Sequence, residues 1–412
     1  MEEALTTNPG RRDATLLFAA RSVRLFAYGF LSIVLVLYLA YIGLSGPAIG
    51  LLLTLTLLGD AAISLWITTR ADRAGRRRML LVGAGLMAAG GVAFLATRRP
   101  ELLMIAAIVG VISPSGNEVG PFLSIEQAAL SQLVTDQQRT RVFAWYNLAG
   151  SVMTALGALA GGWFMQLAGR AGVPEATSYR ALLAAYAAAG LVLAVLFVQL
   201  SPVVETPLSQ AASTGRFGLH RSRSVVARLS ALFALDAFAG AFVLQSVMAY
   251  WFHVRFGAST AALGTLFFGA NLLAAASALL AHRFAARFGL VNTMVFTHLP
   301  SNLLLALVPL MPTMASAMVV LLARFAISQM DVPTRQSYTM AVVAPDERAA
   351  AAGVTAIARS LGAGAAPMVG GAFLLTGSGV PFFVAGGLKI AYDLMLYRAF
   401  RRLPEAGDPQ RP

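Results

Sequence analysis

Hydrophobic runs, each long enough to cross a lipid bilayer, fill almost the whole of this chain. A spanning helix needs about 20 mostly apolar residues. Of the 412 residues, 58% are hydrophobic and only 12% are charged, and the mean hydropathy is +0.72, values that exclude an ordinary soluble domain. The sequence therefore predicts an all-α integral membrane protein with twelve transmembrane helices. The twelve runs are 17–41, 47–69, 78–97, 102–134, 142–168, 178–199, 226–252, 260–282, 290–310, 313–342, 349–376 and 380–400.

The composition excludes several classes of function. The net charge of +13 comes from charges that punctuate hydrophobic runs, whereas nucleic acid needs a basic face, so we expect no nucleic-acid partner. The absence of cysteine excludes disulfides, iron–sulfur clusters and thiolate metal sites. The four histidines have no metal-ligand spacing, and no catalytic constellation or phosphate-binding loop is present. We expect no enzymatic activity, no cofactor and no metal.

The arginines indicate how the chain is oriented, because positive residues are retained on the cytoplasmic side. With the N-terminus inside, 20 arginines lie in inside segments and 5 lie in outside loops. The acidic N-terminus has no short apolar core followed by a cleavage site, so we expect no removable signal peptide. We expect a multi-pass protein of the cell membrane, inner or plasma, with both termini cytoplasmic.

The longest polar connection, residues 200–225, divides the predicted spans six and six. Its Pro, Ser, Thr and Gly content is typical of a linker. We expect an N-terminal six-helix bundle at 1–199, a cytoplasmic linker at 200–225 and a C-terminal six-helix bundle with a short cytoplasmic tail at 226–412.

The second half is a diverged copy of the first. Residues of the first half match residues 214 positions later up to the third span, and 209 positions later from the fourth span on. The matches include polar residues and glycines at a constant shift, which chance does not explain. Two such halves, related by an axis along the membrane normal, are an architecture of secondary transporters. The aligned pairs include Gly43 with Gly257, Ser45 with Ser259, Gly75 with Gly289, Gln127 with Gln336, Arg139 with Arg348 and Ser151 with Ser360.

The loop after the second span reads Thr-Thr-Arg-Ala-Asp-Arg-Ala-Gly-Arg-Arg over residues 68–77. It resembles the cytoplasmic signature of the major facilitator superfamily, Gly-x-Leu-Ala-Asp-Arg-x-Gly-Arg-Arg. The resemblance implies the twelve-helix fold of that family, two pseudo-symmetric six-helix bundles, and a loop that latches the two halves. It assigns gating roles to Asp72, Arg73, Gly75 and Arg76. For residues 76–78 a role as topology anchors stays open.

Glycines in two spans are similar to an exporter pattern of the same superfamily, Gly-x3-Gly-Pro-x2-Gly-Gly. The fifth span has Gly157, Gly161 and Gly162 without the proline, and the eleventh has Gly362, Pro367 and the glycines at 370–371. The pattern favours export, and ordinary packing of small residues between helices is the alternative.

Ionisable residues within spans are functional candidates, because burying a charge in a bilayer is costly without a cavity or partner. In the first span, Arg21, Arg24 and Tyr28 share a helical face. Arg21 is expected to snorkel to the inner interface, and Arg24 either snorkels or faces a cavity. In the seventh span, Asp236 has no basic residue one turn away, so we expect it to titrate or to pair with a cation such as Arg24.

Further charges lie in spans two, ten and twelve. Asp331 precedes Arg335 by four residues, the favourable order for an intrahelical pair, and Arg324 and Ser328 share their face. These four residues are predicted either to bind an anionic group of a ligand or to stabilise the helix, and both interpretations stay open. Asp60 stands alone in span two as a gating, packing or solute-contact residue. Lys389 and Asp393, four residues apart in span twelve, are expected to pair with each other.

The fourth run contains an unusual polar segment, residues 113–122, with two prolines and two glycines. The predicted run of 33 residues is about 50 Å long as a helix and exceeds the bilayer core, so we expect a tilted helix kinked at Pro114 or Pro121. No Lys or Arg in the segment neutralises Glu118, which makes it the first candidate for a titrating group, with Asn117 as a solute contact. A kink that serves only packing is the alternative.

Glu126 is the repeat equivalent of Arg335, so the two charges are predicted to meet across the pseudo-twofold axis as a cytoplasmic gate. The overall hypothesis is a secondary transporter working by alternating access, a monomer that exports a small solute in exchange for protons. An uptake permease of the same fold is the nearest alternative. A membrane sensor that binds a ligand without carrying it is the alternative from another class, and the short tails and linker disfavour it.

Overall fold

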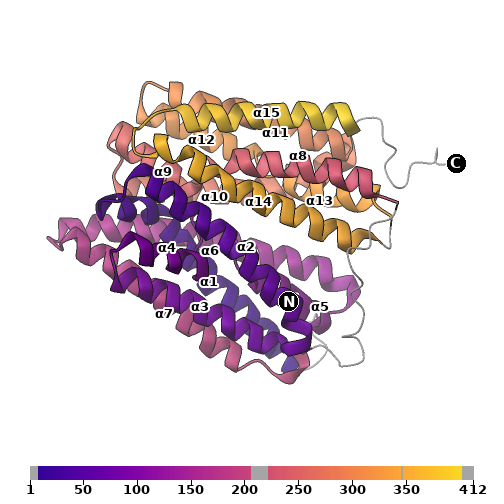
Figure 1. The fold of residues 1–412 in the computed structure, drawn as a ribbon. Coiled ribbons are helices and arrows are strands. Elements are labelled where there is room, and N and C mark those ends of the chain that lie inside the picture. The colour runs from indigo at the N-terminus through magenta and orange to yellow at the C-terminus, as the bar shows by residue number, and fades with distance from the viewer. Residues whose placement is uncertain (1–7, 206–220, 345–346, 401–412) are drawn as a thin grey trace. The chain divides into compact units, whose positions relative to one another are not determined.

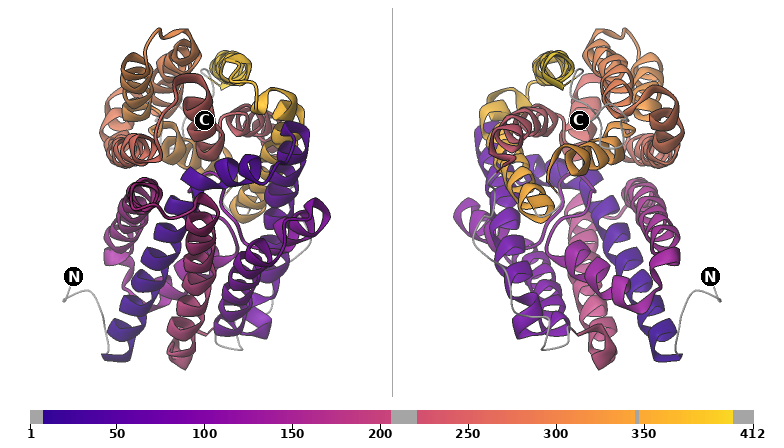
Figure 2. Two further views of the ribbon diagram at one scale, coloured as in Figure 1. Left: turned by 90° about the vertical axis from the view of Figure 1, so that its left-hand side faces the viewer. Right: turned by 90° about the vertical axis from the view of Figure 1, so that its right-hand side faces the viewer.

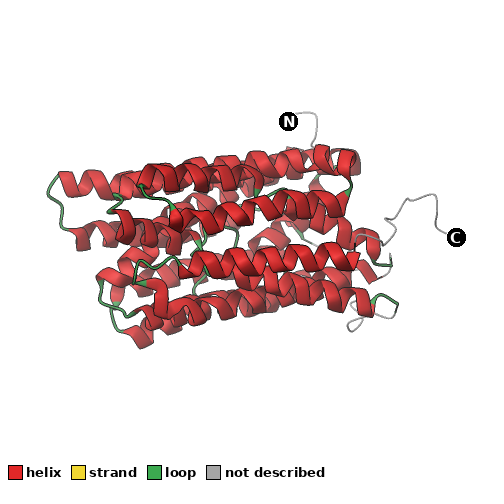
Figure 3. Ribbon diagram, turned by 90° about the horizontal axis from the view of Figure 1, so that it is seen from above, coloured by secondary structure: helices red, strands yellow, loops and turns green. Residues whose placement is uncertain are grey.

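The computed structural model describes residues 8–205, 221–344 and 347–400, and among these residues the regular elements are helices (Figure 3). Contacts divide the chain into two compact units. The first comprises residues 1–213 and 259–268, and the second comprises residues 214–258 and 269–412. Figures 1 and 2 follow the helices of each unit by colour along the chain.

The N-terminal half of the chain contains seven α-helices among its described residues. They are α1 (Asn8–Tyr41), α2 (Gly46–Ala74), α3 (Arg76–Ala96), α4 (Pro100–Val109), α5 (Phe122–Leu133), α6 (Asp136–Arg170) and α7 (Glu175–Val198), followed by the 3-10 turn η2 (Pro202–Val204).

The C-terminal half contains eight α-helices among its described residues. They are α8 (Arg223–Ala241), α9 (Gln245–Phe256), α10 (Thr260–Phe288), α11 (Leu290–Leu307), α12 (Met314–Ile327), α13 (Asp331–Val342), α14 (Arg348–Leu374) and α15 (Val380–Phe400), with the 3-10 turn η4 (Val308–Leu310) after α11.

Ten segments of the described chain are long and apolar enough to cross a membrane. The pair α4 and α5 and the 27-residue α14 account for the other two of the twelve predicted runs. Three runs that the sequence predicts as continuous helices are interrupted. Span four breaks between α4 and α5, span seven between α8 and α9, and span ten between α12 and α13.

The internal repeat extends to the boundaries of the helices. Both α2 and α10 have 29 residues, and their ends differ by the predicted shift of 214. Both α5 and α13 have 12 residues, and their ends differ by 209. The aligned glycines also share backbone conformation, with φ of 89° and 65° at Gly43 and Gly257 and of 100° and 83° at Gly75 and Gly289. Positive φ favours glycine, so the repeat keeps glycine where these turns require it.

Each half packs its helices in the same pattern. Helix α1 lies along α6 as α8 lies along α14, and α3 lies along α7 as α11 lies along α15. The exporter-like glycines are at these contacts: a Cβ on Gly161 would be 2.6 Å from the Cβ of Phe30 in α1, and one on Gly362 would be 2.9 Å from the carbonyl carbon of Ala234 in α8. These glycines permit close helix packing, which accounts for them without reference to transport direction.

The break in span four has a local cause. Pro114 and Pro121 lack the N–H that a helix interior requires, and Gly116 and Gly120 adopt φ of 72° and 82°, outside the helical region. Residues 110–121 therefore form no helix between α4 and α5. The predicted kink is a full interruption of twelve residues, and this non-helical segment carries Asn117 and Glu118.

Candidate functional site

The non-helical segment at 110–121 is held by side chains from the helices around it. The hydroxyl of Tyr28 donates to the carbonyl of Val119 at 3.3 Å, and that of Thr154 donates to the carbonyl of Gly116 at 3.3 Å. The carboxylate of Asp60 accepts from the backbone N–H of Gly120 at 2.6 Å. Non-helical backbone inside a membrane is tolerated where protein satisfies its polar groups. Tyr28 and Asp60 thus position this segment.

Two arginines and two glutamates form a buried charge cluster in the first unit, the N-terminal cluster of Arg21, Arg24, Glu118 and Glu126. Arg24 makes a two-pronged contact with Glu126, with N–O distances of 2.8 and 2.7 Å, and its Nε lies 2.8 Å from Glu118. Arg21 contacts the other oxygen of Glu118 at 2.8 Å. The Tyr146 hydroxyl also donates to Glu126. Each carboxylate is therefore charge-paired within the unit.

This geometry changes several predictions. Glu118 has two arginine partners, so it is not an unpaired carboxylate. Arg21 is 6% exposed and ion-paired, so the predicted snorkelling is wrong. Arg24 is fully buried between Glu118 and Glu126 and stacks 4.4 Å from the Phe122 ring centroid. The sequence missed these pairs because they join residues about 100 positions apart.

The side chains of Glu118 and Glu126 differ in access. Glu126 is fully buried, whereas the Glu118 side chain is 13% exposed and lies in the non-helical segment. The neighbouring Asn117 is exposed. Accessible polar side chains at the N-terminal cluster therefore include Glu118, Asn117 and the exposed Asn147, whose side-chain oxygen accepts from Arg21 at 3.3 Å.

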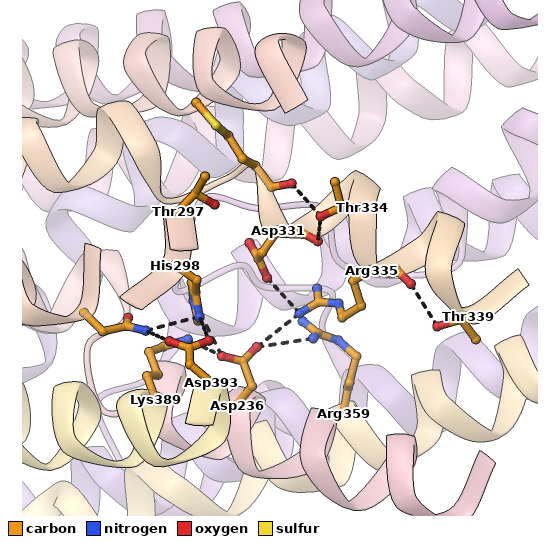
Figure 4. Close-up of polar contacts among 12 residues, drawn as sticks. Asp236, Thr297, His298, Asp331, Thr334, Arg335, Thr339, Arg359, Lys389 and Asp393 are labelled. Carbon is orange, nitrogen blue, oxygen red and sulfur yellow. Dashed lines mark hydrogen bonds and ion pairs between the residues drawn. The ribbon is translucent and has the colours of Figure 1, made fainter. Parts of the chain in front are cut away.

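The second unit holds a larger charge cluster around Asp236 (Figure 4). Lys389 in α15 contacts one Asp236 oxygen at 2.5 Å, and Arg335 in α13 and Arg359 in α14 contact the other at 3.2 and 3.5 Å. Arg335 also pairs with Asp331 at 3.1 Å, as predicted. We call this group the C-terminal cluster; its members are Asp236, His298, Asp331, Arg335, Arg359, Lys389 and Asp393.

The remaining members of the C-terminal cluster lie at one side of Asp236 (Figure 4). The Nδ1 atom of His298 is 2.8 Å from Asp393, and the side-chain amide of Asn302 donates to the other Asp393 oxygen at 2.9 Å. The predicted pair of Lys389 with Asp393 is therefore wrong: Lys389 bonds Asp236 instead. Sequence reasoning passed over His298, because a single histidine inside an apolar run gives no spacing signal.

Asp236 was predicted to titrate alone or to pair with a cation such as Arg24. Its cationic partners are Lys389, Arg335 and Arg359, all within its own unit, and Arg24 is paired in the first unit. The prediction of Arg24 as the partner is wrong. A lysine and two arginines around this one buried carboxylate supply the charge partners that an aspartate in a spanning helix needs.

Each half has a buried ion pair between its first and fourth spans, with the signs of the charges exchanged. Helix α1 supplies Arg24 to Glu126 of α5, and α8 supplies Asp236 to Arg335 of α13. Glu126 and Arg335 are equivalent at the shift of 209. Both find their partners inside their own units, which corrects the prediction that they pair with each other. The fold thus joins its first and fourth spans by a buried ion pair in each unit.

The loop after span two is fixed to the end of span six. The Glu205 carboxylate accepts from the backbone N–H groups of Arg76 at 2.6 Å and Arg77 at 3.2 Å, so it caps the N-terminus of α3. Gly75 supplies the turn with φ of 100°. Arg73 is exposed, and the side chain of Asp72 lies outside the described part of the structure.

A similar cap begins the second half. The Glu347 carboxylate accepts from the N–H groups of Arg221 and Ser222 at 2.8 and 2.9 Å, at the start of α8. Within the described residues, no group of three or more acidic or histidine side chains has the geometry to hold a metal ion. What the two clusters show is charge pairing between buried side chains.

Comparisons with known proteins bear on this arrangement. Residues 17–367 match the family model described as Major Facilitator Superfamily. An uncharacterized membrane protein of Saccharomyces cerevisiae is 31% identical over 419 residues, which cover 93% of each chain.

Solved transporters share the fold. A bacterial homologue of the human lysosomal transporter Spinster, in an inward-facing conformation, superposes with a TM-score of 0.73 at 15% identity over 96% of this chain and 98% of that one. A D-xylose–proton symporter superposes with a TM-score of 0.71 at 18% identity over 96% and 98% of the two chains.

Proposed function

Because this chain belongs to the Major Facilitator Superfamily, we propose that it carries a small solute by alternating access in exchange for protons. It is a multi-pass membrane transporter and not an enzyme. In such transporters the solute site lies near the bilayer midplane between the two halves of the repeat. The proposal adds the coupling ion, the direction and the residues involved.

The observation that carries proton coupling is the N-terminal cluster beside the non-helical segment. Glu118 binds Arg21 and Arg24 simultaneously, at 2.8 Å each. Protonation of Glu118 would remove the charge that holds both guanidinium groups, and it would leave Arg24 with Glu126 alone. Because an unpaired charge in a membrane is costly, protonation and the arrangement of these helices are linked.

Within this proposal Glu118 exchanges the proton, and Asn117 contacts the solute from the adjacent position. Arg24, Tyr28 and Glu126 hold the non-helical segment and its charge partner in place. In the second unit, Asp236, Asp331 and Arg335 form the corresponding charged lining.

Gating is assigned to the loop that contains Asp72, Arg73, Gly75 and Arg76. Its observed contacts fix Gly75 and Arg76 against Glu205. In this proposal the turn holds the end of α2 and the start of α3 in a fixed arrangement, so that a movement of α2 also moves α3.

The proposed direction is export from the cytoplasm, by a monomer in the cell membrane whose termini are both cytoplasmic. The arginine distribution supports the cytoplasmic termini. Export rests on the resemblance of the glycines in α6 and α14 to the exporter pattern, and the same glycines also serve close helix packing. Uptake by the same fold is the second candidate, and the side from which solute enters sealed vesicles decides between them.

The experiment is solute flux into proteoliposomes, over a panel of metabolites and drugs, with and without an imposed pH gradient. We expect flux to depend on the gradient in the wild type. Glu118→Gln should retain solute exchange at equal pH and lose accumulation driven by the gradient.

The matched control is Glu101→Gln, an exposed carboxylate in the first turn of α4, which should behave as the wild type. Binding without flux would contradict transport. Equal transport by Glu118→Gln and the wild type at every pH would contradict the coupling role of Glu118.

A further inference from the structure

The C-terminal cluster, taken together with the neighbouring Arg324, contains more cationic than anionic side chains. With Arg324 included, four cationic side chains accompany three carboxylates, before any proton on His298 is counted. The N-terminal cluster, by contrast, has two arginines and two glutamates. Excess charge inside a membrane protein requires a partner, because its burial is otherwise costly.

Arg324 holds part of this excess. It lies in the last turn of α12 and is 9% exposed, and its Nε has no hydrogen-bond partner among the described residues. Arg324 interacts electrostatically with Asp236 and Asp331, and both of these carboxylates already have other cationic partners. Buried guanidinium N–H groups are normally bonded, so an orphaned one points to a ligand.

Ser328 supplies a second orphaned donor at the same place. It lies four residues after Arg324, in the break between α12 and α13, and is 4% exposed. Its hydroxyl also has no hydrogen-bond partner among the described residues. A guanidinium and a hydroxyl one turn apart suit the oxygen atoms of an anion.

Arg359 provides the accessible cation. Its side chain is 36% exposed, and its contact with Asp236, at 3.5 Å, is the longest of the three that lysine and arginine make with that carboxylate. Arg359 also interacts electrostatically with Asp331, as Arg324 does. Both arginines therefore lie within electrostatic range of the same two carboxylates, and Arg359 is the more exposed of the two.

We propose that Arg324, Ser328 and Arg359 form an anion site that takes the carboxylate or phosphate group of an organic anion. The inference deepens the transport proposal and rests on it, since it names the class of solute. An anionic lipid headgroup offers the same chemistry, so the test separates the two sources.

The test measures thermal unfolding of the whole protein in phosphatidylcholine nanodiscs. Benzoate and phenyl phosphate should raise the unfolding temperature, and neutral benzamide should not. Arg324→Gln and Arg359→Gln should each weaken anion binding by about 10- to 100-fold, the usual effect of removing a charge-assisted contact. Arg255→Gln, at the exposed end of α9, is the matched control and should bind as the wild type.

The lipid arm replaces phosphatidylcholine with phosphatidylglycerol. Stabilisation by phosphatidylglycerol that Arg324→Gln abolishes would identify a headgroup as the source of the anion. Stabilisation by benzoate in phosphatidylcholine would identify a free solute.

The unfolding temperature without ligand gives an independent result. Arg324→Gln should raise it, because the substitution removes one buried cation from a cluster in which cations outnumber carboxylates. A fall would show that Arg324 is structural, as a cation at the C-terminus of α12, and would overturn the proposal. Failure of both anions and of phosphatidylglycerol to stabilise the wild type would overturn it too. Flux of neutral solutes alone would refute the anion site while leaving transport intact, whereas anion binding without flux would refute transport alone.

Discussion

The buried pair of Arg24 and Glu126 offers the sharpest test of how charge is held in the first unit. Arg24→Met removes three N–O contacts of 2.7 to 2.8 Å and leaves Glu126 fully buried with only the Tyr146 hydroxyl as a partner. Removing one partner of a buried pair costs about 3–5 kcal/mol of folding free energy. Glu126→Leu should cost a similar amount, since it leaves Arg24 with Glu118 alone.

The double variant removes both charges at once. Arg21 and Glu118 remain paired at 2.8 Å, so the cluster stays neutral, and the main loss is the acceptor for Tyr146. An unsatisfied buried hydroxyl costs about 1–3 kcal/mol. Arg24→Met with Glu126→Leu should therefore be more stable than either single variant, with a coupling energy of at least about 3 kcal/mol.

The assay is unfolding in mixed detergent micelles, followed by the fluorescence of the four tryptophans, three of which precede residue 206. Free energies of unfolding of the wild type, both single variants and the double variant complete the cycle. A double variant that loses the sum of the two single losses would refute the reasoning, because the two side chains would then act independently.

Two further predictions concern the turn between α2 and α3. Gly75→Ala should destabilise the protein by about 1–2 kcal/mol, because φ at this position is 100°. Gly85→Ala should instead stabilise it by about 0.5–1 kcal/mol, because Gly85 lies in a helix with open space around the added Cβ. Thermal unfolding measures both changes. Glu205→Gln should cost about 0.5–2 kcal/mol, since the carboxylate caps the N–H groups of Arg76 and Arg77, and faster proteolysis at this turn would accompany the loss. Equal stability of the Gly75 and Gly85 variants, or an unchanged proteolysis rate for Glu205→Gln, would contradict these two accounts.

The sequence predicted the spans and the repeat well, because both depend on local quantities. The length of an apolar run sets a helix, and glycine at a fixed shift marks a turn with positive φ, as at Gly43 and Gly257. The break in span seven could not be predicted, because residues 242–244 contain neither proline nor glycine. The break in span ten has a local signal that sequence reasoning passed over: Pro333, the third residue of α13, has no N–H to donate to the carbonyl of Gln329 in the break at 328–330.

The charge pairs show where sequence reasoning stops. Spacing within a helix predicted the pair of Asp331 and Arg335 correctly, and the same rule failed for Lys389 and Asp393. Lys389 bonds Asp236, 153 positions away, because packing brings α15 beside α8. The choice of partner depends on which faces of the helices meet, and a single sequence does not encode that in any local pattern.

Alternating access is most directly tested by chemical labelling of one cysteine. The chain has no cysteine, so Asn117→Cys places a single thiol in the exposed part of the non-helical segment. Val254→Cys, an exposed position near the end of α9, is the control and should be labelled from the outside only.

The measurement is the rate of labelling by a membrane-impermeant maleimide, applied to either face of sealed vesicles. Alternating access predicts that Asn117→Cys is labelled from both faces, and that solute changes the two rates in opposite directions. Labelling from one face only, at a rate indifferent to solute, would contradict the account.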